Sequence, residues 1–370
     1  NASDRSNPKY FSTVGLLLSA LVMLLFGTLP GVMSSIPIMC VLALLNGWFQ
    51  GMGYPPYAKN MVTWFSRSER GAWWSWWNVS HNLGGGIVAP IVGVAIGYLG
   101  TEHWRLGTFA VPAILAAICV LLVLYFVRKR PTEEGLPTVE EVFQEEAAGQ
   151  KSAKMAAGKP ENMNAFQVFY NFVFKNPNSW YLVLIDVFVY MVRFGMITWI
   201  PLYLLKVKGF TKTEMSVAYM LFEWAAIPST ILAGYLVDKY FKGRIMQLPI
   251  YCLVVIFACV IGYMNSDSIL WATVFACITG CLIYIPQSMI PVQAMEVIPT
   301  FALGSAVGLR GFMSYLVGSS LGTTLFGFVV DHWGWDMGFY TLLVGVVLCM
   351  FSCYLSNRGV QKIYAAAEKA

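Results

Sequence analysis

The chain has 370 residues, of which 58% are hydrophobic and only 12% are charged, and its formal net charge is +5. Charged residues make up about 25% of soluble domains, so this composition argues against a soluble globular protein and is typical of polytopic membrane proteins. The basic residues are scattered over short loops, which argues against nucleic-acid binding.

Ten apolar segments follow one another along the chain, and each is long enough for a membrane-spanning helix. A bilayer core requires about 20 apolar residues per helix. Several of these segments contain Gly, Pro and Ser, which membrane helices tolerate. We therefore predict an all-α membrane protein with spans at 11–30, 36–58, 72–99, 106–128, 179–204, 214–237, 246–264, 269–296, 302–330 and 336–356.

Lys and Arg gather in alternate loops, whereas the loops near 31–35 and 265–268 carry no positive charge. The positive-inside rule then puts the basic loops, together with residue 1 and the C-terminus, in the cytoplasm. The basic stretch 206–212 falls in an opposite loop and breaks this bias, and nothing in the sequence explains it.

A long polar stretch, residues 129–178, separates four spans from six. We expect it to be an exposed cytoplasmic linker. The chain would then consist of an N-terminal helical bundle at 1–128, this linker, and a C-terminal six-helix bundle at 179–370.

An internal repeat explains the unequal number of spans. Asp4 and Asp238 open similar basic loops, with an offset of 238 − 4 = 234. The same offset relates two further pairs, His81 with Tyr315 and Gln50 with Tyr284. Two spans precede the loop at Asp238, so two are expected before Asp4. The repeat predicts a six-plus-six protein whose first two helices are missing from this chain, which is then not expected to transport.

Arg193 lies in the middle of the apolar stretch "DVFVYMVRFGMITW". An arginine at bilayer depth costs about 2.5–3.5 kcal/mol on insertion scales, so it must face a wet cavity or a partner. Asp186, Tyr190 and Arg193 share one helical face by their spacing. A guanidinium can bind a phosphoryl group bidentately. The alternative is a structural ion pair between Arg193 and Asp186.

Further polar side chains lie inside predicted spans. His81 lies among asparagines and glycines, and a packing role is the alternative to ligand binding. Glu223 is an acid five residues before Pro228, which is expected to bend that helix. The candidates for hydrogen bonds to a substrate, each with a packing role as the alternative, are Tyr190, Tyr284, Tyr315 and Gln50.

Arg310 is a second arginine inside a span, and Val307, one turn earlier, offers no acid to neutralise it. We expect an unpaired Arg310 to favour a substrate with a second anionic group. The alternative is that Arg310 extends to the cytoplasmic surface, because Glu296 and Pro299 mark that boundary nearby.

The loops at Asp4 and Asp238 resemble the signature loops of the major facilitator superfamily. Within it, "WNVSHNLGGG" and "FVYMVRFG" are similar to the organophosphate:phosphate antiporters, above all the phosphoglycerate and glycerol-3-phosphate transporters. The resemblance runs from residue 4 to about residue 339. It implies twelve helices in two bundles, with one substrate site between them and alternating access.

The resemblance also implies roles for particular residues. Arg193 and a second arginine, expected about 41 positions before residue 1, would hold the phosphoryl group. His81 would lie near the phosphate, and Tyr190, Gln50, Tyr284, Tyr315 and Glu223 would line the pore. The two matching cytoplasmic loops would hold the ends of the bundles together through Asp4, Arg5, Asp238 and Arg244.

The function implied is that of a transporter and not an enzyme, in a bacterial inner membrane, with inorganic phosphate as the exchanged partner. Phosphoglycerate or phosphoenolpyruvate is the favoured substrate. The alternatives are glycerol-3-phosphate, a hexose phosphate, or a transporter-like membrane sensor of a phosphorylated metabolite. We expect a monomer without a cofactor or metal, and the eight cysteines are expected to be small core residues.

Overall fold

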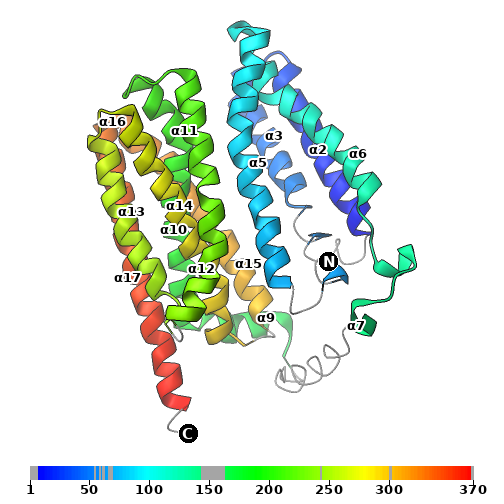
Figure 1. The fold of residues 1–370 in the computed structure, drawn as a ribbon, viewed down its shortest axis with the longest axis vertical. Coiled ribbons are helices and arrows are strands. Elements are labelled where there is room, and N and C mark those ends of the chain that lie inside the picture. The colour runs from blue at the N-terminus through cyan, green and yellow to red at the C-terminus, as the bar shows by residue number, and fades with distance from the viewer. Residues whose placement is uncertain are drawn as a thin grey trace. The chain divides into compact units, whose positions relative to one another are not determined.

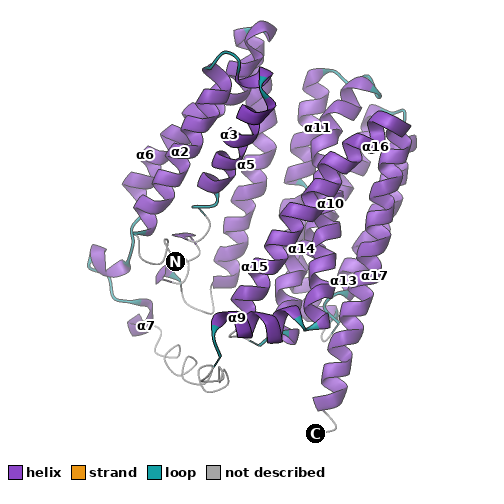
Figure 2. Ribbon diagram, turned by 180° about the vertical axis from the view of Figure 1, so that it is seen from behind, coloured by secondary structure: helices purple, strands orange, loops and turns teal. Residues whose placement is uncertain are grey.

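The computed structural model describes residues 7–53, 56–57, 60, 63–65, 70–142, 163–241, 244–299 and 302–367. All regular secondary structure in these ranges is helical (Figure 2). Contacts divide the chain into two units, Asn1–Ala153 and Lys154–Ala370, and each is described by itself. The finer division predicted above, with a linker at 129–178, stays a prediction.

The first unit is built from helices that pack on a small apolar core, and α2 begins with a side-chain cap. The Asn7 side chain accepts a hydrogen bond from the Lys9 amide at 3.1 Å, and Pro8 occupies the first helical position. Ser19 Oγ donates to Asn46 Oδ1 at 2.6 Å and joins the first two helices. The helices are α2 (Pro8–Thr28), α3 (Ile36–Gln50), α5 (Arg70–Leu99), α6 (Val111–Phe126) and α7 (Val139–Val142) (Figure 1).

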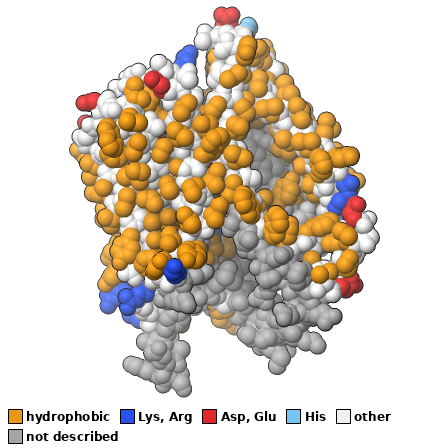
Figure 3. Space-filling view, viewed as in Figure 1, with side chains coloured by type: hydrophobic (Ala, Val, Ile, Leu, Met, Phe, Trp, Pro, Cys, Tyr) orange, Lys and Arg blue, Asp and Glu red, His pale blue; other side chains and the backbone are white. Residues whose placement is uncertain are grey.

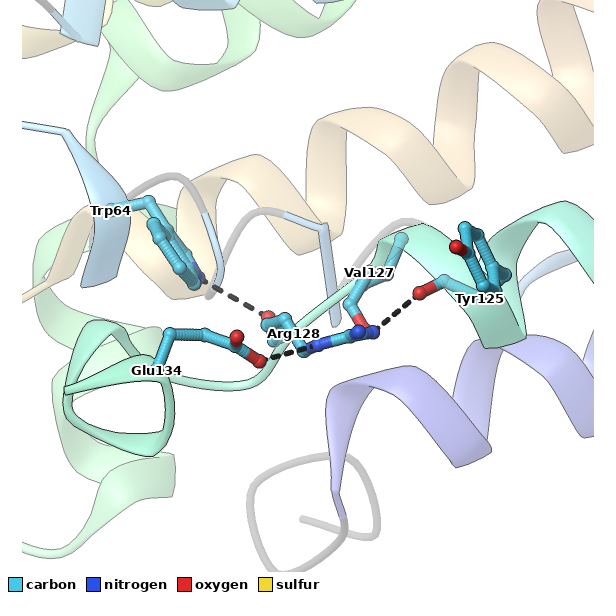
Figure 4. Close-up of polar contacts among 5 residues, drawn as sticks. All are labelled: Trp64, Tyr125, Val127, Arg128 and Glu134. Carbon is cyan, nitrogen blue, oxygen red and sulfur yellow. Dashed lines mark hydrogen bonds and ion pairs between the residues drawn. The ribbon is translucent and has the colours of Figure 1, made fainter. Parts of the chain in front are cut away.

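Arg128 closes the C-terminal end of α6 (Figure 4). Its Nη1 donates to the Tyr125 carbonyl at 2.5 Å, and its Nε pairs with Glu134 Oε1 at 2.5 Å. Its own carbonyl accepts a hydrogen bond from Trp64 Nε1 at 3.2 Å. A cation at this position satisfies the last helical carbonyls and complements the helix dipole. Arg128 thereby ties α6 to the short helical turn Pro131–Glu134.

The second unit is a helical bundle around one continuous apolar core. Its central helix, α10 (Pro177–Lys206), is buried along most of its length and contacts α11, α14, α15 and α17 (Figure 1). The remaining helices are α9 (Ala165–Val168), α11 (Lys212–Trp224), α12 (Ala226–Tyr240), α13 (Gln247–Asn265), α14 (Ile269–Val297), α15 (Leu303–Met313), α16 (Phe326–Trp333) and α17 (Trp335–Ala367). Short π-helical segments at Ser314–Ser319 and Leu321–Leu325 connect α15 to α16.

Gly318 and Gly322 let this π-helical region lie directly against α10. A Cβ on Gly318 would collide with the Val187 carbonyl and the Tyr190 side chain, and one on Gly322 with the Met191 carbonyl. Small residues four apart are a common means of close backbone approach between membrane helices. The contact fixes the position of the polar residues of α10 relative to α15.

Every predicted span coincides with helical structure; one is shorter than predicted, and another breaks near Pro228, where a bend was expected. Nine helices in the described ranges are long and apolar enough to cross a membrane, whereas Ile36–Gln50 is shorter, because the chain turns at 51–53. The span predicted at 214–237 breaks at Ala225. Pro228 explains the break, since proline donates no hydrogen bond to the carbonyl four residues earlier.

The outer surface of the second unit agrees with a membrane location. Apolar side chains cover the middle of its helices in Figure 3, and charged side chains gather near the helix ends. Exposed apolar residues of α13 and α17 such as Val254, Ile261, Val344 and Phe351 belong to this surface.

One basic residue that breaks the positive-inside bias has a structural role. Lys208 Nζ donates to the Met264 carbonyl at 3.0 Å and lies 3.7 Å from Asp267 Oδ1. Its side chain is only 10% exposed. Lys208 therefore holds the loop after α10 against the C-terminal end of α13 and the loop that follows it. Asp267 partly compensates its charge.

The backbone supports the internal repeat independently of the loop motifs. Gly100 follows α5 with φ +87° and ψ 154°, and Gly334 follows α16 with φ +84° and ψ 172°. Their offset is 334 − 100 = 234, the same as between the predicted repeat loops. This conformation is essentially restricted to glycine. Two equivalent helix ends are thus built in the same way.

Candidate functional site

Arg193 lies near the middle of α10, sixteen residues after Pro177. At about 1.5 Å per residue, this is about 24 Å along the helix. The helix begins where the Asn176 side chain accepts a hydrogen bond from the Asn178 amide at 3.0 Å. Arg193 is only 7% exposed, so its charge lies inside the unit.

The Arg193 guanidinium contacts α14 through an amide and an aromatic ring. Its Nη1 donates to Gln287 Oε1 at 3.3 Å. The guanidinium carbon lies 4.4 Å from the centre of the Tyr284 ring and 5.6 Å from that of Phe194. A guanidinium over an aromatic face is stabilised by a cation–π interaction, more strongly where water is excluded.

Glu223 of α11 supplies the negative charge in this cluster. Tyr284 Oη donates to Glu223 Oε2 at 2.9 Å, and Glu223 is 2% exposed. Tyr284 therefore lies between a buried cation, which contacts its ring, and a buried carboxylate, which accepts its hydroxyl. Glu223 thus compensates the Arg193 charge across the Tyr284 side chain.

Tyr190 joins this cluster from α10 itself. Gln287 Nε2 donates to Tyr190 Oη at 3.2 Å, so one amide bridges Tyr190 and Arg193. The Tyr190 ring also meets that of Tyr315 edge to face, with centroids 5.0 Å apart. Tyr315 is 61% exposed in its unit. Tyr190, Tyr284, Glu223 and Arg193 are thus brought together as predicted, although substrate contact by any of them stays a prediction.

Gln287 belongs to this cluster and was not predicted. It lies one helical turn after Tyr284, beside Pro286. The available signal was an uncharged amide inside an otherwise apolar span. The same kind of signal singled out Gln50, whereas Gln287 was not among the predicted residues.

Asp186 and Arg310 form an ion pair between α10 and α15, which corrects two expectations. Arg310 Nε lies 3.1 Å from Asp186 Oδ2, and the side chains are 17% and 5% exposed. Arg310 is therefore not unpaired, and it does not extend to the surface. The carboxylate that neutralises it comes from another helix, so the sequence around Val307 could not reveal it. Asp186, the alternative partner considered for Arg193, pairs with Arg310.

His81 and Gln50 lie in the first unit. His81 is an exposed residue of α5, and its neighbour Asn82 is completely buried. Gln50 is the last residue of α3 and is exposed, so it lies at a helix end and not inside a span. Their substrate contacts stay predictions.

Only some of the residues predicted to act in the cytoplasmic loops lie in the described part of the chain. Asp4 and Arg5 lie outside the described residues. Asp238 belongs to the last turn of α12, and its side chain also lies outside the described part. Arg244 is exposed, and its amide donates to the Phe241 carbonyl at 2.9 Å. A gating role of these residues stays a prediction.

In the described part of the chain, neither a metal-binding cluster nor the groove between α13 and α17 provides a competing polar site. The described part of the chain contains no cluster of three or more His, Cys, Asp or Glu side chains that could hold a metal. An open groove of about 730 Å³ runs between α13 and α17, but it is lined mostly by apolar residues such as Phe257 and Val344. The buried polar cluster around Arg193 is therefore the candidate site.

The chemistry of this cluster is that of a site for an oxyanion. Arginine presents planar donors that suit phosphate or carboxylate, and tyrosine hydroxyls and an amide can complete the shell. Charged side chains inside membrane spans commonly mark a transport pathway. The fold is that of a polytopic helical membrane protein, and the cluster has the donors that a small anion requires.

The chain belongs to the Major Facilitator Superfamily, whose sequence profile matches residues 1–323. A phosphoglycerate transporter protein of Salmonella typhimurium is 52% identical over 368 residues, which cover 100% of this chain and 78% of that protein. A glycerol-3-phosphate transporter of Bacillus subtilis is 40% identical, over 94% of this chain and 77% of its own length.

A solved structure supports the fold. A bacterial homologue of the human lysosomal transporter Spinster, in an inward-facing and unoccupied conformation, matches with a TM-score of 0.67 at 16% identity. The match covers 98% of this chain and 85% of that structure. The predicted resemblance and the all-α major facilitator fold are therefore confirmed, and the relatives are transporters and not enzymes.

Proposed function

We propose that this protein is a secondary transporter that exchanges a phosphorylated three-carbon acid, phosphoglycerate or phosphoenolpyruvate, for inorganic phosphate by alternating access. The observation that carries the proposal is the buried Arg193, which donates to Gln287 and lies over the Tyr284 ring, with Tyr190 bonded to the same Gln287 amide. The choice of substrate is supported by the 52% identity to a phosphoglycerate transporter protein.

Arg193 would hold the phosphoryl oxygens through its planar donors. Gln287, whose amide contacts both Arg193 and Tyr190, would turn with the guanidinium. Tyr284 lies between the Arg193 guanidinium and the Glu223 carboxylate. An incoming phosphate dianion would compete with Glu223 for the positive charge of Arg193. Exchange requires that this competition differ between conformations, because a ligand shifts an equilibrium only by its differential affinity.

The substrate argument from an unpaired Arg310 no longer applies, because Asp186 compensates its charge. The preference for a three-carbon acid therefore rests on the relative, and glycerol-3-phosphate is the runner-up because of the second relative. Inorganic phosphate is proposed as the exchanged anion because it carries the same kind of phosphoryl oxygens that Arg193 would bind.

We further propose that the protein is a monomer in a bacterial inner membrane, with its C-terminus in the cytoplasm. The distribution of Lys and Arg over alternate loops supports this orientation. Lys208 is the strongest exception, and its contacts with Met264 and Asp267 supply a separate reason for its position.

Counterflow in proteoliposomes tests the proposal. Vesicles that carry the protein are loaded with phosphate, and uptake of labelled phosphate is measured against external competitors. Phosphoglycerate is expected to inhibit at lower concentration than glycerol-3-phosphate. The reverse order would make the protein a glycerol-3-phosphate carrier. Phosphoglycerate binding without any counterflow would indicate a membrane sensor.

A further inference from the structure

The groove between α13 and α17 lies on the outer surface of the second unit, where the two helices run side by side (Figures 1 and 2). The helices pack through buried Tyr263 and Phe339, whose ring centroids are 5.7 Å apart. Exposed side chains flank this contact, among them Ile261 and Val344. The groove of about 730 Å³ is therefore open to the surroundings of the helices, and its lining differs from the residues of the Arg193 cluster.

The C-terminal end of α13 lies beside the N-terminal end of α17. Tyr203 connects the two ends, because its hydroxyl donates to the Met264 carbonyl at 3.3 Å and its ring lies 5.1 Å from that of Trp335. The next residue of each helix, Asn265 and Asp336, lines the groove. One end of the groove is therefore polar, whereas the rest of its lining is apolar.

The groove is about as deep as one leaflet of a bilayer. Along α17 its lining extends from Asp336 to Leu348, which is 348 − 336 = 12 residues or about 18 Å. Half of a hydrocarbon core of about 30 Å is about 15 Å. Trp271 and Trp333 are exposed near the polar end, and tryptophans of membrane proteins gather at the interface with water. The groove thus begins at this interface and continues into the hydrocarbon, where an acyl chain can fill it.

The polar end of the groove presents hydrogen-bond acceptors. Asp336 is exposed and forms no ion pair with any described residue, whereas the nearby Asp267 is paired with Lys208. The Asn265 Nδ2 donates to the Ile261 carbonyl at 2.9 Å, which leaves the amide oxygen to accept. The described lining contains no Lys, Arg or His. Anionic headgroups require basic pockets, so this end instead suits a cationic group that carries N–H donors.

We propose that this groove binds phosphatidylethanolamine, with the ammonium group of the lipid at Asp336 and Asn265 and one acyl chain between α13 and α17. The headgroup decides which lipid is retained, because lipid tails are as apolar as the side chains that they meet. An ethanolamine ammonium donates charge-assisted hydrogen bonds to a carboxylate, whereas choline has no N–H donor. Phosphatidylglycerol carries a net negative charge, which Asp336 repels. The site is independent of which anion the protein transports.

Competition between lipids with identical acyl chains tests the headgroup. The purified protein is incubated in detergent with equal amounts of phosphatidylethanolamine and phosphatidylcholine, and native mass spectrometry measures which lipid the protein ions carry. Wild type is expected to carry phosphatidylethanolamine in about tenfold excess, the effect of a charge-assisted hydrogen bond that one of the two lipids cannot make. Phosphatidylglycerol in place of phosphatidylcholine should give at least the same excess. Equal binding of the lipids by wild type overturns the inference.

Variants of Asp336 test the assigned contact. Asp336→Asn should lower the excess of phosphatidylethanolamine to about twofold or less, and Asp336→Glu should restore it because the charge returns. Asp331→Asn, at an exposed acid near the end of α16, is the matched control and should keep the wild-type excess. Asp336 also lies in the first turn of α17, where a carboxylate complements the helix dipole. If that were its only role, Asp336→Asn would lose stability and keep the lipid preference, which overturns the inference.

A second pair of variants tests the groove with Asp336 intact, and it decides the question even if Asp336→Asn does not fold. Val344 lines the groove, whereas Val255 is an exposed residue of α13 outside it. Val344→Trp should lose most of the bound phosphatidylethanolamine because the indole occupies the space of the chain, and Val255→Trp should keep it. Equal retention by both variants overturns the inference. So does a dimer of the protein that Val344→Trp alone dissociates, because a second copy would then occupy the groove.

Discussion

The chemistry of the second unit depends on how each buried charge is compensated. Arg193 is bordered by the Tyr284 ring, and the Tyr284 hydroxyl donates to Glu223. Arg310 meets Asp186 directly. Removing one member of a buried pair leaves an uncompensated charge, which is more harmful than losing both. Single substitutions here should therefore affect folding as well as transport, and each needs a matched control.

Tyr284→Phe tests the hydroxyl that donates a hydrogen bond to Glu223. The ring beside Arg193 remains, but the buried carboxylate loses its donor, so the free energy of unfolding should fall by about 1–3 kcal/mol. Chemical denaturation in detergent measures this change. Tyr340→Phe, on an exposed tyrosine of α17, serves as the control. Equal stability of the two variants would mean that the Tyr284–Glu223 bond contributes nothing.

Arg193→Lys tests whether the planar guanidinium, with its paired N–H donors, is needed in addition to the positive charge. Lysine keeps the charge but cannot bind an oxyanion bidentately, so the phosphate concentration for half-maximal counterflow should rise about tenfold or more. Arg358→Lys, on an exposed arginine of α17, should leave it unchanged. Normal counterflow by folded Arg193→Lys would show that a point charge is sufficient.

At the scale of elements, α10 contributes Arg193 and Tyr190 to the candidate site. The π-helical region packed against α10 determines how close α10 and α15 lie. Gly318 and Gly322 have no room for a side chain because the α10 backbone lies against them. The glycine-rich run was evident in the sequence. Which helix it packs against was not, since any small-residue face can serve several neighbours.

Gly322→Ala should disturb this contact. The added Cβ meets the Met191 carbonyl and the Gly195 amide, and overpacking of this kind costs about 1–3 kcal/mol in the free energy of unfolding. Gly308→Ala on α15 has nothing within 4 Å and should be neutral or stabilise by about 0.5–1 kcal/mol. Thermal unfolding in the same detergent compares them. If both alanines behave alike, close packing at Gly322 is not required.

At the scale of the whole molecule, the internal repeat means that the two units share a structural feature at equivalent helix ends. Gly100 and Gly334 adopt one unusual conformation at equivalent helix ends, 234 positions apart. The sequence offset was found from loop motifs alone. The backbone repeats it at positions that those motifs did not include.

Gly100→Ala and Gly334→Ala should therefore destabilise the protein to a similar extent. An alanine in this region of φ and ψ is strained by about 1–3 kcal/mol. Gly97→Ala, inside α5 with nothing within 4 Å, is the control and should not destabilise. Unfolding midpoints measured in parallel test this, and a tolerant Gly334→Ala beside a sensitive Gly100→Ala would contradict the equivalence of the two ends.

Local sequence features were sufficient to predict which segments are membrane helices and that Arg193 lies inside one of them. Hydropathy and helical spacing are local properties, so the spans, the break near Pro228 and the position of Arg193 could all be predicted. The tertiary structure alone decided the partners: Gln287 for Arg193, and Asp186 for Arg310, which lies 310 − 186 = 124 positions away. Charge compensation depends on which helices are neighbours, and bundle packing sets that without any local signal.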